Sequence, residues 1–525
     1  MENKIKYIAR FKVETQTPLG IGTGRSGLLN ERLIARDANG LPYIPGTALA
    51  GIVRHELEKE GQTVNYLFGF QTPREKEGQG SRIVFSSGLL VAYDNQSVIE
   101  GLQQVDYSHI YYSSFRRKNL PQRDHVRISH RGVAEKTGKF EEELVYKGAR
   151  FAFEIEIEGT EEDEKIWDKI LSILNHPSFR IGAGTRKGFG QLKVLSCHTR
   201  RFNLERKEDL LAYLGKSSSL NSDITDWNTY HNEDKQAINW LHYEIRLKPE
   251  SFFLFGSGLW DEKADLTPKK EKCFVWEDGK EPELKSYYLI PATSIKGAIS
   301  HRVAYYYNDL NKTSIEAEIE KNVPLEFDIE GALQKMTDDQ LPSRIDQLNY
   351  AADSIEWKKL EAKIEALGAN QSDSWQIYKD FLEQNSDDKL FKNLSVGENN
   401  DAVKTLFGYA KTGDDGANGS VIFSDLFLEI KEESVKYFNH VSIDRFTGGA
   451  RDGALFTQEV VASTNVFTMD IFVEPTAFSD KIVKLAFEEA IEDLTKGNLQ
   501  LGGSSAKGHG VFTGNWKPKN ANDHA

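Results

Sequence analysis

Two short segments of the sequence combine closely spaced glycines with a lysine, at residues 182–190 and 502–510. Glycine permits positive φ angles and lets backbone N–H groups approach a phosphate closely, and the lysine adds positive charge. Neither segment ends in the Gly-Lys-Ser/Thr of a P-loop, and each leads into a predicted strand rather than the helix of a dinucleotide-binding motif. The pattern predicts two sites for backbone phosphates, with a tight turn that holds no ligand as the alternative. The candidate residues are Gly184, Arg186, Lys187 and Gly188 in the first segment and Lys507 and Gly508 in the second.

Basic residues alternate with aromatic ones in two further stretches. The stretch from Phe115 to Arg131 holds six Lys or Arg residues against one Asp, and the stretch 440–451 combines arginines with a phenylalanine. Such mixtures suit RNA, whose phosphates attract the cations and whose unstacked bases lie on aromatic rings. A solvated charged loop is the alternative. The candidate RNA-binding residues are Arg116, Arg117, Lys118, Arg127, Arg131, Arg445, Phe446 and Arg451.

A third group of polar residues lies on two predicted helices that follow Pro45 and Pro291. If RNA runs along these helices, the side chains would contact phosphates, which position the nucleic acid but do not specify its sequence. Simple solvation of an outer helix face is the alternative. The candidates are Arg54, Lys296, His301 and Arg302.

The elements that must position these residues occur twice in the chain. Four blocks recur in the same order: 41–58 resembles 287–304, 65–91 resembles 404–430, 125–146 resembles 440–461, and 180–194 resembles 500–514. Each short match alone would be weak, but four in register indicate that one domain is duplicated.

Apolar periodicity gives the order of elements within each repeat. Stretches such as 151–159 and 466–474 alternate with period two and predict strands, whereas Leu49, Val53 and Leu57 have the spacing of a helix. The order strand, helix, strand, strand, helix, strand is that of a ferredoxin-like fold. We therefore expect an α+β protein with two tandem ferredoxin-like (RRM-like) domains at 1–205 and 241–518. A polar linker at 206–240 would join them, and a helical insertion at about 309–403 would interrupt the second.

The bulk composition sets limits on the kind of protein. The chain has 525 residues and a net charge of −14, but residues 309–403 alone carry 21 acidic and 10 basic side chains, so the remainder is nearly neutral. Whole-chain charge is then a poor guide to what the other surfaces bind. The only two cysteines, Cys197 and Cys273, are far apart, which argues against a zinc site or a disulfide framework. With no long apolar run and no signal-peptide core, we expect a cytoplasmic protein without a membrane partner or a small-molecule cofactor.

These blocks resemble the RAMP superfamily of CRISPR proteins, and more narrowly the backbone subunits of type III effector complexes. A chain with two such copies is similar to the tandem-fused backbone subunit of type III-D complexes. The segments that carry the resemblance are Ile44–Thr47 with Gly51, Ile290–Pro291 with Lys296–Gly297, both Leu-Phe-Gly triplets, Ile443–Gly448 with Gly453–Phe456, and both glycine loops.

The resemblance implies a role in antiviral defence. Backbone subunits of this kind bind the guide RNA (crRNA) and the guide–target duplex, together with other subunits of the type III effector complex. Each inserts a β-hairpin thumb that flips a base out of the pairing. Guide pairing supplies sequence specificity, and the protein reads backbone shape. Active copies cut target RNA at a loop aspartate, as endoribonucleases that depend on a divalent cation, Mg²⁺ or Mn²⁺.

In those active copies the aspartate lies a few residues after a glycine turn and shortly before a proline. Asp265 fits this place in the second repeat, between Gly258 and Pro268, and Asp261 is the reserve. A carboxylate there could hold the metal or orient the 2′-hydroxyl for attack on the adjacent phosphate. In the first repeat the position holds Glu31, or Asn30 if the loop shifts by one residue, so the first repeat departs from the pattern.

Two other functions remain open at this stage. The chain could be a non-catalytic crRNA-binding subunit with both copies inactive. It could also be an endoribonuclease that processes precursor crRNA, in which case His55 or His301 would be the residues to test.

Overall fold

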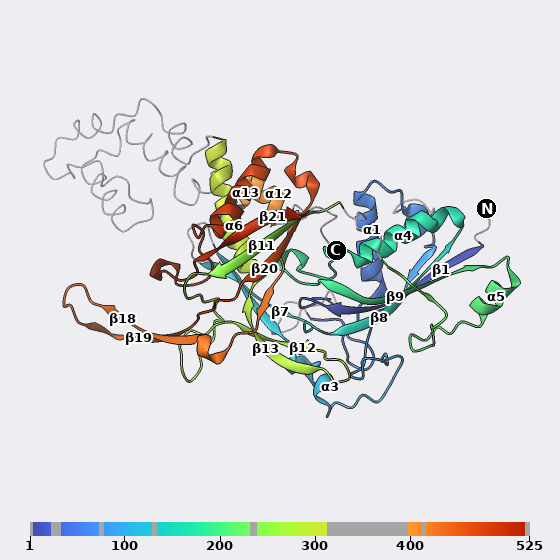
Figure 1. Ribbon diagram of the computed structural model, residues 1–525, viewed down its shortest axis with the longest axis horizontal. Helices are drawn as coiled ribbons and strands as arrows, with labels where there is room; N and C mark the ends of the chain where they lie inside the picture. The colour runs from blue at the N-terminus through green and yellow to red at the C-terminus, as the bar shows by residue number, and fades with distance from the viewer. Residues whose placement is uncertain are drawn as a thin grey trace, which may run out of the picture. The chain divides into compact units, whose positions relative to one another are not determined.

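The computed structural model describes residues 4–22, 33–72, 78–128, 134–231, 239–311, 397–410 and 416–519 (Figure 1). The chain forms two compact units. The first unit comprises Met1–Ile299, Ser420–Ser479 and Ile491–Ala525, and the second comprises Ser300–Gly419 and Asp480–Ala490. Both predicted sheets and both predicted thumbs belong to the first unit.

The first repeat forms an antiparallel sheet with the strand order β10-β9-β1-β8-β4, and β5 also pairs with β8. Its strands are β1 (Ile5–Thr15), β4 (Ile83–Phe85), β5 (Leu89–Leu90), β8 (Arg150–Gly159), β9 (Leu192–Asn203) and β10 (Asn228–Thr229). Its two long helices are α1 (Gly46–Lys59) and α4 (Glu164–Asn175). The first strand of the repeat therefore lies between the last and the third, which is the ferredoxin-like order.

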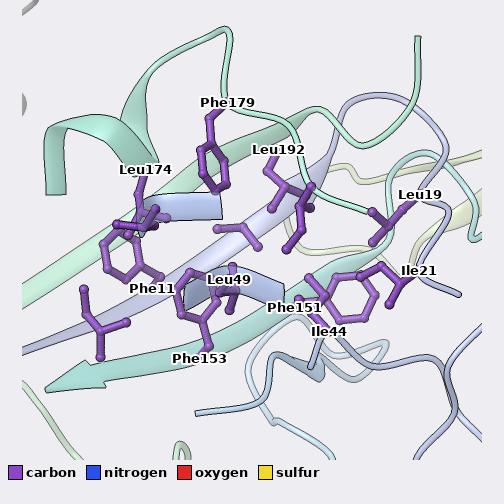
Figure 2. Packing of buried hydrophobic residues seen from close by; sticks show 14 of the residues in the cluster. Phe11, Leu19, Ile21, Ile44, Leu49, Phe151, Phe153, Leu174, Phe179 and Leu192 are labelled. Carbon is purple, nitrogen blue, oxygen red and sulfur yellow. The ribbon is translucent and has the colours of Figure 1, made fainter. Parts of the chain in front are cut away.

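The core of the first repeat lies on the face of the sheet that α1 and α4 cover (Figure 2). Phe11 of β1 and Phe153 of β8 face each other directly in the register, and their rings stack with centroids 5.0 Å apart. Helix α1 follows Pro45, whose fixed φ suits a helix start, and α1 contributes Leu49 to the same cluster. The alternation along β1 and β8 thus buries one row of side chains against the helices.

The second repeat forms a sheet of the same order, β16-β20-β11-β21. Its elements are β11 (Leu241–Pro249), β16 (Val421–Ile422), β20 (Phe467–Val473), β21 (Phe512–Lys519), α6 (Ala292–Leu310), α12 (Asp401–Phe407) and α13 (Lys481–Thr495). The two matching strand orders confirm the predicted α+β class with tandem ferredoxin-like domains.

Two β-hairpins occupy the places predicted for the thumbs. They are β6 (Gln122–Ile128) with β7 (Ala134–Glu143), and β18 (Val435–Ile443) with β19 (Ala450–Val461). Figure 1 shows β18 and β19 as a long hairpin. The remaining elements are β2 (Phe70–Gln71), β3 (Gly78–Gln79), β12 (Lys270–Val275), β13 (Glu283–Ile290), β14 (Gly408–Ala410), β15 (Gly416–Asn418), β17 (Leu426–Leu428), α2 (Asn65–Phe68), α3 (Ile110–Ser114) and α5 (Lys207–Leu214).

The segment predicted as a linker is described at residues 206–231 and 239–240, and its first part packs on the first sheet. Its start is helical, as α5, and β10 extends the sheet by pairing with β9. Leu220 and Trp227 join small apolar clusters with residues of the first repeat. Most of the predicted insertion at 309–403, namely 312–396, lies outside the described residues.

A buried arginine joins the two repeats within the first unit. Arg123 of β6 donates to both carboxylate oxygens of Glu271 in β12, at 2.7 and 3.0 Å, and lies 2.8 Å from Asp425. All three side chains are at least nine-tenths buried. Burial opposes the charge of Arg123, but the carboxylates of Asp425 and Glu271 raise its pKa. Beside this triad, Phe274 packs into the aromatic core of the first repeat, 4.9 Å from Tyr111.

No helix in the described ranges combines the length and apolar character needed to cross a bilayer.

Candidate RNA interface

The base of the second thumb brings together three segments that are far apart in the sequence. The loop that precedes β12 runs along β19, because Asp265 N–H donates to Thr457 O at 2.9 Å and Glu459 N–H donates to Leu266 O at 2.8 Å. Asp265 Oδ2 in turn accepts a 2.8 Å hydrogen bond from Thr457 N–H. This pair of bonds fixes the exposed Asp265 carboxylate at the thumb base, and Oδ1 has no hydrogen-bond partner among the described residues.

Asp261 shapes the same loop. Its Oδ1 accepts hydrogen bonds from the N–H groups of Lys263 and Ala264, both at 2.8 Å. These two N–H groups stabilise the carboxylate, which lowers the pKa of Asp261. The turn buries Ala264 and directs the chain toward β19. Of the two predicted catalytic aspartates, only Asp265 contacts the thumb.

The second glycine loop reaches the same part of β19. Gln458 Nε2 donates to Ser504 Oγ at 2.9 Å, and Gln458 Oε1 lies 3.0 Å from His440 Nε2 of β18. The Lys507 ammonium lies 4.8 Å from the ring centroid of Phe456. The sharp loop depends on positive φ, which even the non-glycine residue Ser504 adopts at 61°. Asp265, His440, Lys507 and Ser504 thus surround β19 residues 456–458.

The tip of the second thumb is exposed and tightly turned. Asp444 Oδ1 accepts hydrogen bonds from the N–H groups of Phe446 and Thr447, both at 2.9 Å, and these bonds lower the pKa of Asp444. The turn leaves the Phe446 ring fully exposed, with Arg445 and Arg451 exposed beside it. An unpaired base could stack on such a ring while the arginines contact phosphates.

The first repeat has the same arrangement with one difference in charge. Lys187 lies 4.2 Å from the ring centroid of Phe140, as Lys507 does over Phe456. However, β7 carries Glu142 opposite Arg123 where β19 carries Gln458 opposite Phe438. Glu142 pairs with Lys187 and with His125, each at 3.1 Å. Burial opposes ionisation of Glu142, but the hydrogen bond from His125 and the charge of Lys187 lower its pKa to about 2. The cations of the first loop are therefore largely neutralised by the protein.

The rest of the first glycine loop contacts protein as well. Arg186 pairs with Glu474 at 2.8 Å and lies 5.1 Å from the Trp240 ring, and burial lowers its pKa in spite of Glu474. Gly188 has a φ of 100°, and a Cβ built on it would lie 2.5 Å from Cβ of Ala292. Gly508 of the second loop has open space at the equivalent point. The first loop is thus used to join the repeats, while the second presents its lysine to solvent.

A comparison with protein families agrees with this duplicated architecture. The family model of the RAMP superfamily matches residues 12–193 and 283–513, which together make up most of the chain. The chain belongs to the RAMP superfamily. This membership gives it a CRISPR-associated RNA-binding role, with CRISPR RNA and proteins of the CRISPR complex as its partners in general terms. No curated protein matches the sequence.

The other predicted RNA-binding residues of this RAMP chain lie in different settings. Arg54 bonds to Glu58 and Asn65, and Arg117 lies 3.5 Å from Glu143. Arg116 lies over the Tyr107 ring at 4.9 Å, and Lys118 is exposed. Lys296 and Arg302 are half-buried on α6, and His301 on the same helix is exposed. The side chain of Arg127 and all of Arg131 and Glu31 lie outside the described residues.

Residues that the sequence did not single out complete the interface. Gln458, Ser504 and His509 line the second glycine loop, and Trp260 is 77% exposed in the loop that carries Asp265. Gln458 and His509 could have been found from the sequence by comparing the two repeats, because the first repeat has Glu142 and Phe189 at these two positions. Among the described residues, no group of three or more His, Cys, Asp or Glu side chains could hold a metal ion.

Proposed function

We propose that this RAMP protein is a tandem backbone subunit of a type III CRISPR effector complex. It binds crRNA and the guide–target duplex, and it cleaves target RNA at the base of the second thumb. The observation that supports cleavage is the position of Asp265, whose carboxylate is held by Thr457 N–H on the thumb strand that also contacts the second glycine loop. In this proposal the first repeat binds RNA without cutting it.

The reaction proposed is metal-dependent cleavage of an RNA phosphodiester. Mg²⁺ is commonly bound by one or two carboxylates, by substrate phosphate oxygens and by water, so a single protein carboxylate is compatible with it. Asp265 fits this role because one oxygen is fixed by Thr457 N–H and the other is not bonded to a described residue. When bound, the cation would stabilise the charge that develops on the phosphate. Lys507 would contact a backbone phosphate and help to hold the strand in place.

The test compares Asp265→Asn with Asp261→Asn in the assembled effector complex, with target RNA and Mg²⁺. Loss of the metal-binding oxygen removes several kcal/mol of transition-state stabilisation, so Asp265→Asn should slow cleavage at the second-repeat site by about 100-fold or more. An amide at position 261 retains an oxygen that can accept from Lys263 and Ala264, so Asp261→Asn should cleave at nearly the wild-type rate. Equal cleavage rates for wild type and Asp265→Asn at every site would refute the catalytic part.

A second candidate function is a non-catalytic crRNA-binding subunit. It is favoured by the lack, in the part of the chain that the structure describes, of a group of three or more His, Cys, Asp or Glu side chains that could hold a metal ion. If Asp265→Asn leaves cleavage unchanged while crRNA still co-purifies with the tagged chain, this candidate replaces the first.

A further inference from the structure

A cluster of three cationic or titratable side chains lies between the second thumb and the second glycine loop. We call His440, Lys507 and His509 the histidine cluster. His440 of β18 faces the Phe456 ring at 4.9 Å, and Lys507 lies 4.8 Å from that ring from the loop side. The charges of both His440 and Lys507 act on His509, so the three groups are neighbours.

His509 is nine-tenths buried and lacks polar partners among the described residues. Its ring lies between Phe252 and Phe438, with centroid distances of 5.8 and 6.0 Å. Nδ1 is buried, and neither ring nitrogen makes a hydrogen bond to any residue that the structure describes. A buried nitrogen without a partner costs free energy, which a ligand that hydrogen-bonds to the ring would recover.

The first repeat carries different side chains at this place. There Phe189 stands in place of His509, and Arg123 lies 5.0 Å from the Phe189 ring. Glu142 pairs with Lys187 and lies 3.1 Å from His125. The second repeat replaces the glutamate by Gln458 and the phenylalanine by His509. The first difference removes a negative charge, and the second introduces a group that can take up a proton. Lys507 is exposed beside them.

We propose that the histidine cluster binds one backbone phosphate of RNA, and that this binding is coupled to uptake of a proton by His509. The proposal rests on the proposed RNA-binding function and identifies where in the second repeat a phosphate is held. Lys507 supplies a permanent charge, His440 and His509 supply ring N–H donors, and Gly508, with open space beside it, allows a phosphate to approach the loop backbone.

The coupling follows from the charges around His509. Burial lowers the pKa of His509, and the charges of His440 and Lys507 lower it further, so these surroundings favour the neutral ring in the free protein. The other groups that pack on the ring, Phe252 and Phe438, carry no charge. A phosphodiester anion beside the ring favours the protonated form. Affinity therefore rises as pH falls, by at most about tenfold per pH unit for one proton, between the pKa of the complex and that of the free protein.

The experiment measures the Kd of the full-length chain for a fluorescent, unstructured RNA of about 20 nucleotides from about pH 5.5 to 8.0 at constant ionic strength. Wild type should bind more tightly as pH falls. His509→Phe, which copies the first repeat, should keep binding at the alkaline end but lose most of the slope. Gln458→Glu should weaken binding about tenfold, because the new carboxylate pairs with His440 and Lys507 as Glu142 does in the first repeat. His231→Gln, at an exposed histidine of the connector, is the matched control and should retain the wild-type slope.

A second measurement follows the titration in the wild-type protein and uses a variant only to assign the signal. In wild-type protein labelled at the histidine Cε1 positions, the signal that is missing from His509→Phe should titrate at higher pH with RNA than without it. An unchanged titration, or a slope retained in His509→Phe, overturns the proposal while RNA binding itself stands. Absence of RNA binding in wild type at every pH would defeat the proposed function and the proposal with it. If His509→Phe leaves RNA binding unchanged but releases a protein from the assembled complex, the cluster contacts a protein carboxylate and the proposal is likewise wrong.

Discussion

The buried Arg123 offers the sharpest test of how the two repeats are joined. Its guanidinium makes a bidentate pair with Glu271 and a third contact with Asp425, and all three groups are shielded from water. Arg123→Met keeps most of the side-chain volume but leaves two buried carboxylates without their cation. Removing one partner of a buried ion pair costs about 3–5 kcal/mol. We therefore expect the contact between the two repeats around Arg123, Glu271 and Asp425, called the joint below, to lose about this much stability.

The effect should depend on pH in a defined direction. Burial raises the pKa of Asp425, and Arg123 counteracts this in the wild type. Without Arg123 the folded-state pKa of the carboxyl rises further above its unfolded value. A carboxyl with a raised folded pKa destabilises the fold when it must ionise, so Arg123→Met should be most unstable at neutral and alkaline pH. The difference from wild type should shrink as pH falls toward the ordinary range of a carboxyl.

Cys273 gives a local assay, because it lies in β12 two residues after Glu271 and is buried. Burial raises the pKa of its thiol to about 12, so the thiol reacts with a labelling reagent only when β12 opens. In a Cys197→Ala background, the labelling rate at mildly alkaline pH reports the opening equilibrium. A loss of about 3–5 kcal/mol should raise this rate roughly 100-fold to several thousand-fold in Arg123→Met.

Two controls separate charge from packing. Replacing all three groups, by Arg123→Met with Glu271→Gln and Asp425→Asn, should restore slow labelling, because no unpaired charge remains and the new amide oxygen at position 425 can still accept from Ala292 N–H. Arg200→Met breaks a partly exposed pair with Asp226 and should change stability by less than about 1 kcal/mol. If Arg123→Met labels at nearly the wild-type rate, the triad does not stabilise the joint and the reasoning fails.

Two further predictions concern the same joint and the first glycine loop. Gly148 has a φ of 84°, and a Cβ built on it would overlap Phe274 O. Gly148→Ala should therefore lower the free energy of unfolding, measured in urea, by about 2 kcal/mol or more. Gly61 has a φ of 75° with open space around it, so Gly61→Ala should cost only about 1 kcal/mol. A smaller loss for Gly148 than for Gly61 would show that β12 does not pack there. Glu142→Gln should lower the free energy of unfolding at pH 7 by about 1 kcal/mol, since the charged hydrogen bonds from His125 and Lys187 are lost. The folded pKa of Glu142 is about 2, so this contribution is present above the unfolded pKa and is lost as pH falls toward 2. The stabilities of variant and wild type should therefore converge in acid. A difference in stability that stays constant with pH would contradict the pairing.

The fold could be predicted because its signals are local. The alternation along β1 and β8 and the helical spacing of Leu49, Val53 and Leu57 recur in the second repeat, and both sheets have the expected strand order. The partners of individual side chains could not be predicted in the same way. Arg123 reads as one of six basic residues in a stretch suited to RNA, yet it is buried against Glu271, 148 residues later in the chain. Burial and pairing of a charge depend on such distant neighbours, which no local pattern contains.

In the candidate site, too, the local loops could be predicted from the sequence and the side-chain partners could not. Asp265, Lys507 and Phe446 lie on exposed loops that the sequence made recognisable, because a glycine turn or a thumb tip is defined by its own residues, and the roles assigned to these residues stay predictions. It did not distinguish the two glycine loops, since both carry the lysine. What distinguishes them is one position on the neighbouring hairpin, Glu142 or Gln458, and this position meets the loop only after folding.

The differences between the repeats follow from the place each occupies in the chain. The first repeat holds the second through Arg123 and Arg186, which pair with Asp425 and Glu474, and its Glu142 pairs with Lys187 of its own glycine loop. The second repeat has Phe438, Ala506 and Gln458 at the equivalent positions, so the same three charges are absent there. A surface that keeps Lys507 but loses its carboxylate attracts anions, and RNA phosphate is the anion that the RAMP membership supplies. The proposed phosphate contact of the second loop therefore depends on the neutral Gln458, which stands where Glu142 pairs with Lys187 in the first repeat.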